Sequence, residues 1–178
     1  MNKITIHDKT FEPFIGGEII QAAVENIAQQ LMHDFEGKTP LFLCVLNGSF
    51  MFAADLFKVY EGPAEISFIR LSSYKGTATT EEIKTVMGLT EDIAGRDLVV
   101  LEDIIDSGLT VLHLLEELGK HKPNSIRIAT LLLKPKALRT KIKPDYVGIE
   151  IPNDFILGYG LDYDGLGRNL KDIFKIVE

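Results

Sequence analysis

The segment LEDIIDSGLT at residues 101–110 contains three carboxylates and a turn-forming Ser-Gly pair, and it directly continues an apolar run. The apolar run 98–101 is typical of a strand that is buried on both faces of a parallel sheet. Apolar residues then recur at helical spacing from Val111, so the sequence predicts a strand, a polar loop that begins at Glu102, and a helix. Such a loop presents free backbone N–H groups at the helix N-terminus, and phosphate is the anion that we expect there.

Glu102 and Asp103 would repel a phosphate unless they face another part of the ligand. An ionised carboxylate only accepts hydrogen bonds, so these residues suit sugar hydroxyls, or they suit a Mg²⁺ ion. A phosphorylated sugar that carries a metal-bound pyrophosphate would satisfy the acids, the turn and the helix together. The alternative is a solvated acidic loop at a strand end, in which Asp106 merely caps the helix.

Alternating strands and helices surround this segment. Helical spacing predicts helices over 17–35, 49–59 and 110–119, and apolar runs predict strands over 41–46, 65–71, 98–101, 126–133 and 146–150. This alternation predicts an α/β fold with a mainly parallel central sheet flanked by helices. Residues 72–90 are polar and weakly periodic, so we expect a long loop or a loosely held hairpin there, and such segments are often lids.

The composition is that of one acidic globular domain. The 178 residues are 46% hydrophobic, which is enough for one buried core, and no boundary divides them. The 26 acidic residues outnumber the 19 basic ones, so there is no general attraction for nucleic acid or an anionic membrane. No signal peptide or membrane-length apolar run is found, and the single cysteine, Cys44, lies in an apolar run. We therefore expect a cytoplasmic protein without an internal disulfide.

Several segments resemble a known family. Residues 99–110 resemble the phosphoribosyl pyrophosphate signature of type I phosphoribosyltransferases. The resemblance narrows to the hypoxanthine-guanine (6-oxopurine) phosphoribosyltransferases through VLNGSF at 45–50, SSYKG at 72–76, LLLKP at 131–135 and EIPNDFILGYGLDY at 150–163. It implies one domain of the type I phosphoribosyltransferase fold over 1–178, with a small hood from the terminal segments. Within that domain, it implies a flexible active-site loop at about 72–90 and a base-binding hood at about 151–178.

The resemblance also implies a reaction. In purine salvage, 5-phosphoribosyl passes from phosphoribosyl pyrophosphate to N9 of hypoxanthine or guanine, with Mg²⁺ as cofactor. Catalysis must then stabilise positive charge on the ribose and negative charge on the departing pyrophosphate. The implied partners are phosphoribosyl pyrophosphate, a 6-oxopurine base and further copies of the chain in a homodimer or homotetramer, with no nucleic acid or membrane. Two alternatives stay open, a xanthine-preferring enzyme and a non-catalytic nucleotide-sensing regulator of the same fold.

Site residues follow from the matching positions. By resemblance, Asp106 is the general base that takes the proton from purine N7, and Ser73 and Tyr74 belong to the mobile loop. The residues implied to bind phosphoribosyl pyrophosphate are Glu102, Asp103, Asp106, Ser107, Gly108, Leu109, Thr110, Leu46, Asn47, Gly48 and Arg168. Those implied to bind the purine are Lys134, Phe155, Ile156 and Asp162, and those implied to hold metal are Glu102, Asp103 and Asp162.

Individual roles are implied in the same way. Lys134 would donate to the purine 6-oxo group, Phe155 would stack on its face, and the backbone of Ile156 would bind its edge. Asp162 would help a second Mg²⁺ through water, and the fork of donors on Arg168 would bind pyrophosphate.

The segment at 46–48 would hold pyrophosphate through a non-proline cis peptide between Leu46 and Asn47. Many relatives carry Lys at position 47, so no role is expected for the Asn47 side chain. Leu109, where some relatives have Lys, and Asp154 also depart from the family pattern, which leaves the base preference open.

Overall fold

The computed structural model describes residues 2–75, 81–89 and 91–177, and for 72–75 and 81–87 it describes the backbone alone. Within these residues, a six-stranded sheet has the order β5-β4-β3-β6-β7-β8. Its strands are β3 Leu41–Leu46, β4 Glu65–Lys75, β5 Glu81–Met87, β6 Asp97–Ile105, β7 Ser125–Leu133 and β8 Tyr146–Glu150. Every pairing in the sheet is parallel except that of β4 with β5, which confirms the predicted mainly parallel sheet.

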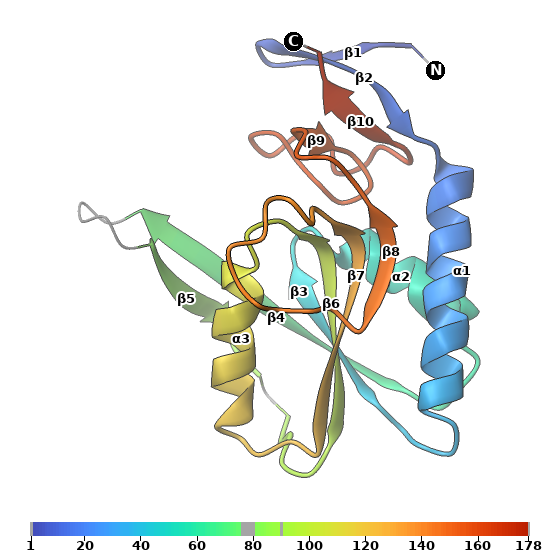
Figure 1. The fold of residues 1–178 in the computed structure, drawn as a ribbon, viewed down its shortest axis with the longest axis vertical. Helices are drawn as coiled ribbons and strands as arrows, with labels where there is room; N and C mark the ends of the chain where they lie inside the picture. Colours follow the sequence, from blue (N-terminus) through green and yellow to red (C-terminus); the bar gives the residue numbers. More distant parts are fainter. Residues whose placement is uncertain (1, 76–80, 90, 178) are drawn as a thin grey trace.

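Helices cover both faces of this sheet (Figure 1). They are α1 Gly17–Asp34, α2 Phe50–Val59 and α3 Leu109–Gly119. Alternate side chains of β3 and β6 point to opposite faces, as the pleat requires. Phe42, Cys44 and Leu101 join the core under α1 and α2, whereas Leu43 and Val100 join the core under α3.

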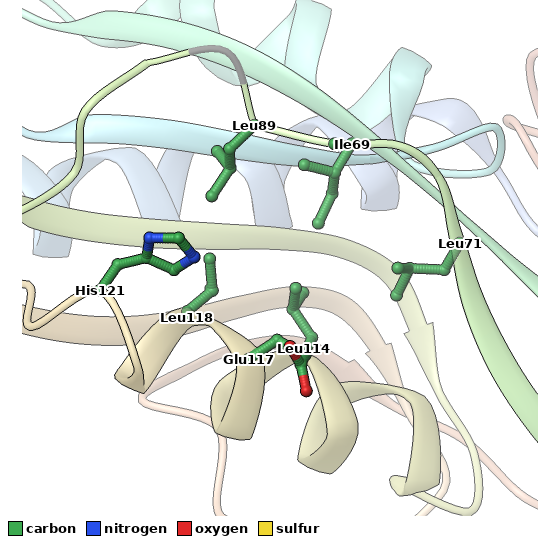
Figure 2. Close-up of a pocket in the computed structure, with 8 residues that line it drawn as sticks. Ile69, Leu71, Leu89, Leu114, Glu117, Leu118 and His121 are labelled. Carbon is green, nitrogen blue, oxygen red and sulfur yellow. The ribbon is translucent and has the colours of Figure 1, made fainter.

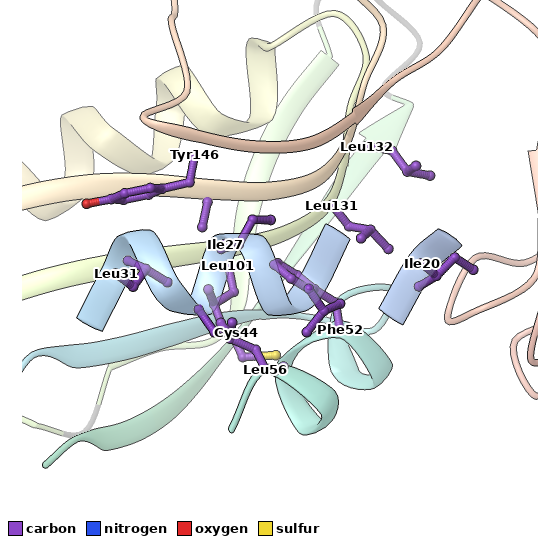
Figure 3. Packing of buried hydrophobic residues seen from close by; sticks show 14 of the residues in the cluster. Ile20, Ile27, Leu31, Cys44, Phe52, Leu56, Leu101, Leu131, Leu132 and Tyr146 are labelled. Carbon is purple, nitrogen blue, oxygen red and sulfur yellow. The ribbon is translucent and has the colours of Figure 1, made fainter. Parts of the chain in front are cut away.

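The larger core lies between the sheet and the first two helices (Figure 3). On α1, the apolar spacing of Ile20, Val24, Ile27 and Leu31 produces one buried stripe, as the sequence predicts. Phe52 and Leu56 of α2 meet the same core. None of the described helices is long and apolar enough to cross a membrane.

A second, smaller sheet forms the hood. Among the described residues it has four strands in the order β1-β2-β10-β9, all antiparallel. They are β1 Ile4–Ile6, β2 Lys9–Ile15, β9 Ile156–Leu157 and β10 Ile173–Ile176. Figure 1 shows this sheet beyond the carboxyl ends of the parallel strands, with both termini in it. The hood therefore comes from both terminal segments, as the resemblance implies, with residues 4–15 as its N-terminal part.

Two predicted boundaries are wrong. The polar loop does not begin at Glu102, because β6 continues to Ile105 and pairs with β7 through Glu102 opposite Thr130 and Ile105 opposite Leu133. The apolar pair at 104–105 keeps the strand in the sheet. The strand predicted over 65–71 extends to Lys75, where it pairs with β5, so the hairpin alternative for 72–90 is the one observed. Residues 76–80 and 90 lie outside the described part of the chain.

Candidate active site

The junction between β6 and α3 forms a pocket lined by residues 102–108, 110 and 111. α3 begins directly after Gly108, whose φ of 78° is left-handed, and a Cβ at this position would collide with the Thr140 hydroxyl. The N-cap residue of α3 is Gly108, and the first N–H of the helix, that of Leu109, donates to Ser107 Oγ at 3.4 Å, so the side chain that contacts this helix end is Ser107 and not Asp106. The first-turn N–H groups and the positive end of the helix dipole make this loop suited to phosphate.

Glu102 and Asp103 stand at the carboxyl ends of the parallel strands, where Arg168 is the cation that acts on Asp103. Glu102 is only 6% exposed, and its Oε1 has no hydrogen-bond partner among the described residues. Asp103 Oδ1 accepts a hydrogen bond from the N–H of Ile104 at 2.9 Å. Glu102 is buried and Asp103 is half-buried, so both carboxylates gain from hydroxyl donors or a cation.

Their pKa values reflect this environment. Burial raises the pKa of Glu102 well above its ordinary value, and the neighbouring charge of Asp103 adds to the effect. Burial also raises the pKa of Asp103 to about 6, against the lowering effects of backbone hydrogen bonds and of Arg168. Arg168 is therefore near enough to act on this carboxyl group.

The acid pair fits a divalent cation, since carboxylate oxygens are ligands that such ions prefer. The third predicted metal residue, Asp162, lies close enough to raise the pKa of Asp103, although no three His, Cys, Asp or Glu side chains among the described residues are grouped as a metal cluster. Both oxygens of Asp162 are engaged, Oδ1 with Arg168 Nη2 at 2.6 Å and Oδ2 with the N–H of Gly165 at 2.8 Å. Direct coordination would therefore fall to Glu102 and Asp103.

The predicted base and the predicted purine donor meet at the same edge. Asp106 follows β6 and Lys134 follows β7, and parallel neighbours end on the same side of a sheet. Lys134 Nζ lies 3.0 Å from Asp106 Oδ2, and Lys134 is only 7% exposed. Lys134 is thus a buried, paired cation and not a solvated lysine at a strand end.

The predicted pyrophosphate loop lies against Asp103. The Leu46–Asn47 peptide bond is cis, as the resemblance implies. A Cβ on Gly48 would collide with the Asp103 carboxylate, and a Cβ on Gly160 would collide with the carbonyl oxygen of Gly48. The loop is therefore enclosed between the acid pair and the C-terminal tail. The Asn47 side chain is exposed.

The C-terminal tail carries the remaining predicted residues. Arg168 Nη1 donates to the carbonyl oxygen of Gly160 at 2.7 Å while Nη2 binds Asp162, so one guanidinium ties the tail together. Phe155 is 45% exposed, and Ile156 is buried in β9. A core role for Phe155 is therefore excluded.

The mobile-loop residues are only partly described. The backbones of Ser73 and Tyr74 pair with Ile83 and Glu82 of β5, and their side chains lie outside the described structure. Their predicted role as a lid stays a prediction. Sequence reasoning did not identify Thr140, which packs on Gly108, because nothing in its local pattern distinguishes it from other loop residues.

A separate pocket lies between β4 and α3 (Figure 2). It is bounded by Ile69 and Leu71 of β4, by the segment 88–89, and by Leu114 and Leu118 of α3, with Glu117 and His121 beside them. Its lining is mainly aliphatic and lacks the paired acids and helix N-terminus of the first pocket. The chemistry therefore belongs to the carboxyl edge of the sheet.

Comparisons with known proteins define the class. The family model described as "Phosphoribosyl transferase domain" matches residues 16–164. A match over most of the chain, together with the parallel sheet and the antiparallel hood, identifies a type I phosphoribosyltransferase.

Similar proteins narrow this class. The hypoxanthine-guanine phosphoribosyltransferase of Streptococcus thermophilus (strain CNRZ 1066) is 42% identical over 162 residues, which are 90% of each chain. The enzyme of that name from Bacillus subtilis (strain 168) is 41% identical over 160 residues, 89% of each chain. A crystal structure of a hypoxanthine-guanine phosphoribosyltransferase from Bacillus anthracis, with a HEPES molecule in its active site, superposes with a TM-score of 0.89 at 40% identity, and the match covers 93% of this chain and 98% of that one. The chain belongs to the hypoxanthine-guanine phosphoribosyltransferase family.

Members of this family are transferases of purine salvage that use a divalent metal ion with phosphoribosyl pyrophosphate. The predicted family, fold class and enzyme class are confirmed. The relatives named above support neither a xanthine-preferring enzyme nor a regulator.

Proposed function

We propose that this enzyme transfers 5-phosphoribosyl from phosphoribosyl pyrophosphate to N9 of hypoxanthine or guanine, which yields IMP or GMP and pyrophosphate. The observation that carries the proposal is the contact of Lys134 with Asp106, 3.0 Å apart beside the anion loop. N7 and the 6-oxo group lie on one edge of a 6-oxopurine, so adjacent acceptor and donor side chains match both. Adenine has an amino donor at position 6, which would face the Lys134 ammonium, also a donor.

The proton moves to Asp106. As N9 bonds to C1 of the ribose, the purine gains positive charge, and the Asp106 carboxylate takes the proton from N7. The ammonium of Lys134 donates to the 6-oxo oxygen and holds the base in register with Asp106. Phe155 stacks on the face of the base, and the backbone of Ile156 binds its edge.

The ribose and its phosphate lie along the β6–α3 junction. Glu102 and Asp103 accept from the ribose 2- and 3-hydroxyls, which supply the donors that Glu102 Oε1 lacks. The 5-phosphate accepts from the loop at 106–110, where the hydroxyls of Ser107 and Thr110 and the backbone of Leu109 add donors to the helix N-terminus. Gly108 keeps this turn free of a side chain.

Pyrophosphate leaves on the side of the glycine loop. The backbone of Leu46, Asn47 and Gly48 donates to its oxygens, and the guanidinium of Arg168 offsets its charge. We propose Mg²⁺ as the divalent ion, held by Glu102 and Asp103, with Asp162 supporting a second ion through water. When bound, Mg²⁺ neutralises the developing charge of the leaving group.

Several expectations stay predictions. Ser73 and Tyr74 would close over the site and exclude water, which would otherwise hydrolyse the activated sugar. The single domain over 1–178, its flexible loop at 72–90 and its base-binding hood at 151–178 belong to the proposal. So do the cytoplasmic location, the homodimer or homotetramer, and the absence of nucleic-acid and membrane partners.

The test incubates the protein with Mg²⁺, phosphoribosyl pyrophosphate and hypoxanthine, guanine, xanthine or adenine, and follows nucleotide formation by absorbance. We expect turnover of hypoxanthine and guanine. Turnover of adenine alone would overturn the base assignment, preferred turnover of xanthine would select the xanthine enzyme, and no turnover would favour the regulator. Lys134→Met should abolish most of the activity, whereas the exposed Lys143→Met should keep it.

A further inference from the structure

Phe155 is held from one side by two other aromatic rings of the hood. Its ring centroid lies 6.2 Å from that of Phe11, which is fully buried, and 5.7 Å from that of Tyr163. The Phe155 and Tyr163 rings are nearly perpendicular, at 85°, which is a favoured arrangement for aromatic pairs. The orientation of the exposed Phe155 ring therefore depends on where Tyr163 lies.

Tyr163 is in turn held by the turn between β1 and β2. Its hydroxyl donates to Asp8 Oδ1 at 2.7 Å, although the two residues are 155 positions apart in the sequence. The His7 ring meets the Tyr163 ring edge-on at 5.7 Å, and Lys9 Nζ lies 5.9 Å from its centroid. His7 and Asp8 of the turn and Lys9, the first residue of β2, thus contact a single ring.

This contact is charge-assisted. The hydrogen bond from Tyr163 lowers the pKa of Asp8, so the acceptor is ionised at neutral pH. Phe11 packs on both Phe155 and Tyr163, with its ring centroid 6.0 Å from that of Tyr163, and it belongs to β2, the strand that follows the turn. The N-terminal hairpin therefore reaches the exposed Phe155 ring by two routes, through Tyr163 and through Phe11.

We propose that Tyr163, held by Asp8, is a positioning residue that sets the orientation of Phe155 and thereby the affinity for the purine base. This inference rests on the proposed function, in which Phe155 stacks on the base. It assigns the N-terminal hairpin a part in base recognition, although nothing between residues 4 and 15 contacts the anion loop pocket.

The experiment measures kcat and the KM of each substrate separately for Tyr163→Leu, Tyr163→Phe and Asp8→Ala. Tyr163→Leu removes the ring and should raise the KM for hypoxanthine about 3- to 10-fold, as expected for a lost aromatic pair. Tyr163→Phe removes only the hydrogen bond, whereas Asp8→Ala removes it together with the ion pair between Asp8 Oδ2 and Lys9 Nζ at 3.5 Å. Each variant should raise the KM for hypoxanthine about 2- to 5-fold. The Tyr163→Phe/Asp8→Ala double variant should resemble Asp8→Ala alone, because that single variant has already lost the hydrogen bond between the two residues. The KM for phosphoribosyl pyrophosphate and kcat should change less than about twofold.

Tyr146→Phe is the matched control. It removes a tyrosine–aspartate hydrogen bond of the same length, 2.7 Å to Asp34, at the far end of α1. This variant should lose thermal stability without a change in the KM for hypoxanthine. A general loss of stability is thereby separated from an effect on the base.

Phe155→Leu separates the two proposals. If Phe155→Leu raises the KM for hypoxanthine and the Tyr163 variants leave it unchanged, the positioning role is overturned and the stacking role stands. If Phe155→Leu has no effect, both proposals fail. Equal increases in the KM values for hypoxanthine and for phosphoribosyl pyrophosphate would also overturn the positioning role. If Tyr163→Leu does not fold, Tyr163→Phe still provides the test.

Discussion

The carboxylates at the carboxyl-end edge of the central sheet, where the parallel strands end, and those in the hood differ in how their charge is matched. At the edge, Glu102 Oε1 has no partner among the described residues, and the pKa of Asp103 is raised to about 6, mainly by burial. In the hood, Asp162 is bound by Arg168 at 2.6 Å, and Asp172 accepts from the N–H of Gly17 at 2.7 Å.

This difference separates acids that a ligand completes from acids that the protein itself pairs. Buried acids without partners lower stability, so a ligand that supplies donors or positive charge gains by binding to them. Paired acids instead hold the hood together and keep its aromatic residues in place. The four predictions below test the two regions against each other.

The largest effect is expected at the edge, from Asp106→Asn. The amide still accepts a hydrogen bond from Lys134, but it does not take the N7 proton, so kcat should fall about 10²- to 10⁴-fold. The KM for phosphoribosyl pyrophosphate should stay nearly constant in steady-state assays. Asp92→Asn, which changes an exposed loop carboxylate, is the control. Unchanged kcat would reduce Asp106 to a structural partner of Lys134.

A smaller effect is expected where the hood reaches the edge. Arg168→Gln removes the cation that binds Asp162 and the Gly160 carbonyl. The KM for phosphoribosyl pyrophosphate should rise about tenfold, as expected when one charge-assisted hydrogen bond to the substrate is lost. Arg127→Gln breaks a surface Arg–Asp pair at 2.7 Å and should leave that KM unchanged. Similar KM values for the two variants would contradict the role of Arg168.

Glu102→Gln should stabilise the free protein while it impairs ribose binding. A raised carboxyl pKa means that the folded protein keeps protons that the unfolded chain releases, so the free energy of unfolding falls as pH rises above about 4.5. Removing this carboxylate should add about 1–3 kcal/mol at pH 8, or several degrees in Tm. The gain should vanish near pH 4, where the unfolded chain is protonated as well.

Thermal melts across this pH range would check the prediction, with Glu116→Gln on the exposed side of α3 as the control. A gain of the same size at every pH would mean that the carboxylate charge is not its cause.

The smallest effect is expected in the hood, from Asp172→Ala. This buried carboxylate takes the place of a side-chain cap for α1, since Gly16 at the N-cap position provides none. Its loss should cost about 1–2 kcal/mol, the usual value of an N-cap, and should lower Tm by a few degrees. Asp172→Asn keeps an acceptor and should recover most of the loss in a thermal melt. A larger loss for Asn than for Ala would contradict the capping role.

Much of the central sheet could be predicted because its strands are local apolar runs. The strands at 41–46 and 146–150 were predicted with the observed limits. The end of β6 could not be predicted, because acidic residues within a strand look like the start of a loop until their pairing with β7 is known. The hood strands at 4–15 were not predicted, because β2 is paired to a strand from the other end of the chain.

The sequence by itself determined the order of strand, acids, turn and helix, and through it the family, the anion loop and the acid pair. These features depend on neighbours in the chain, which apolar periodicity and turn residues record directly. Only the tertiary structure decided that Lys134 meets Asp106, that Glu102 Oε1 finds no partner in the described part of the chain, and that Tyr163 is held by Asp8. Each of these depends on which strands and turns lie side by side, and burial and pairing between distant residues leave no periodic signal in the chain.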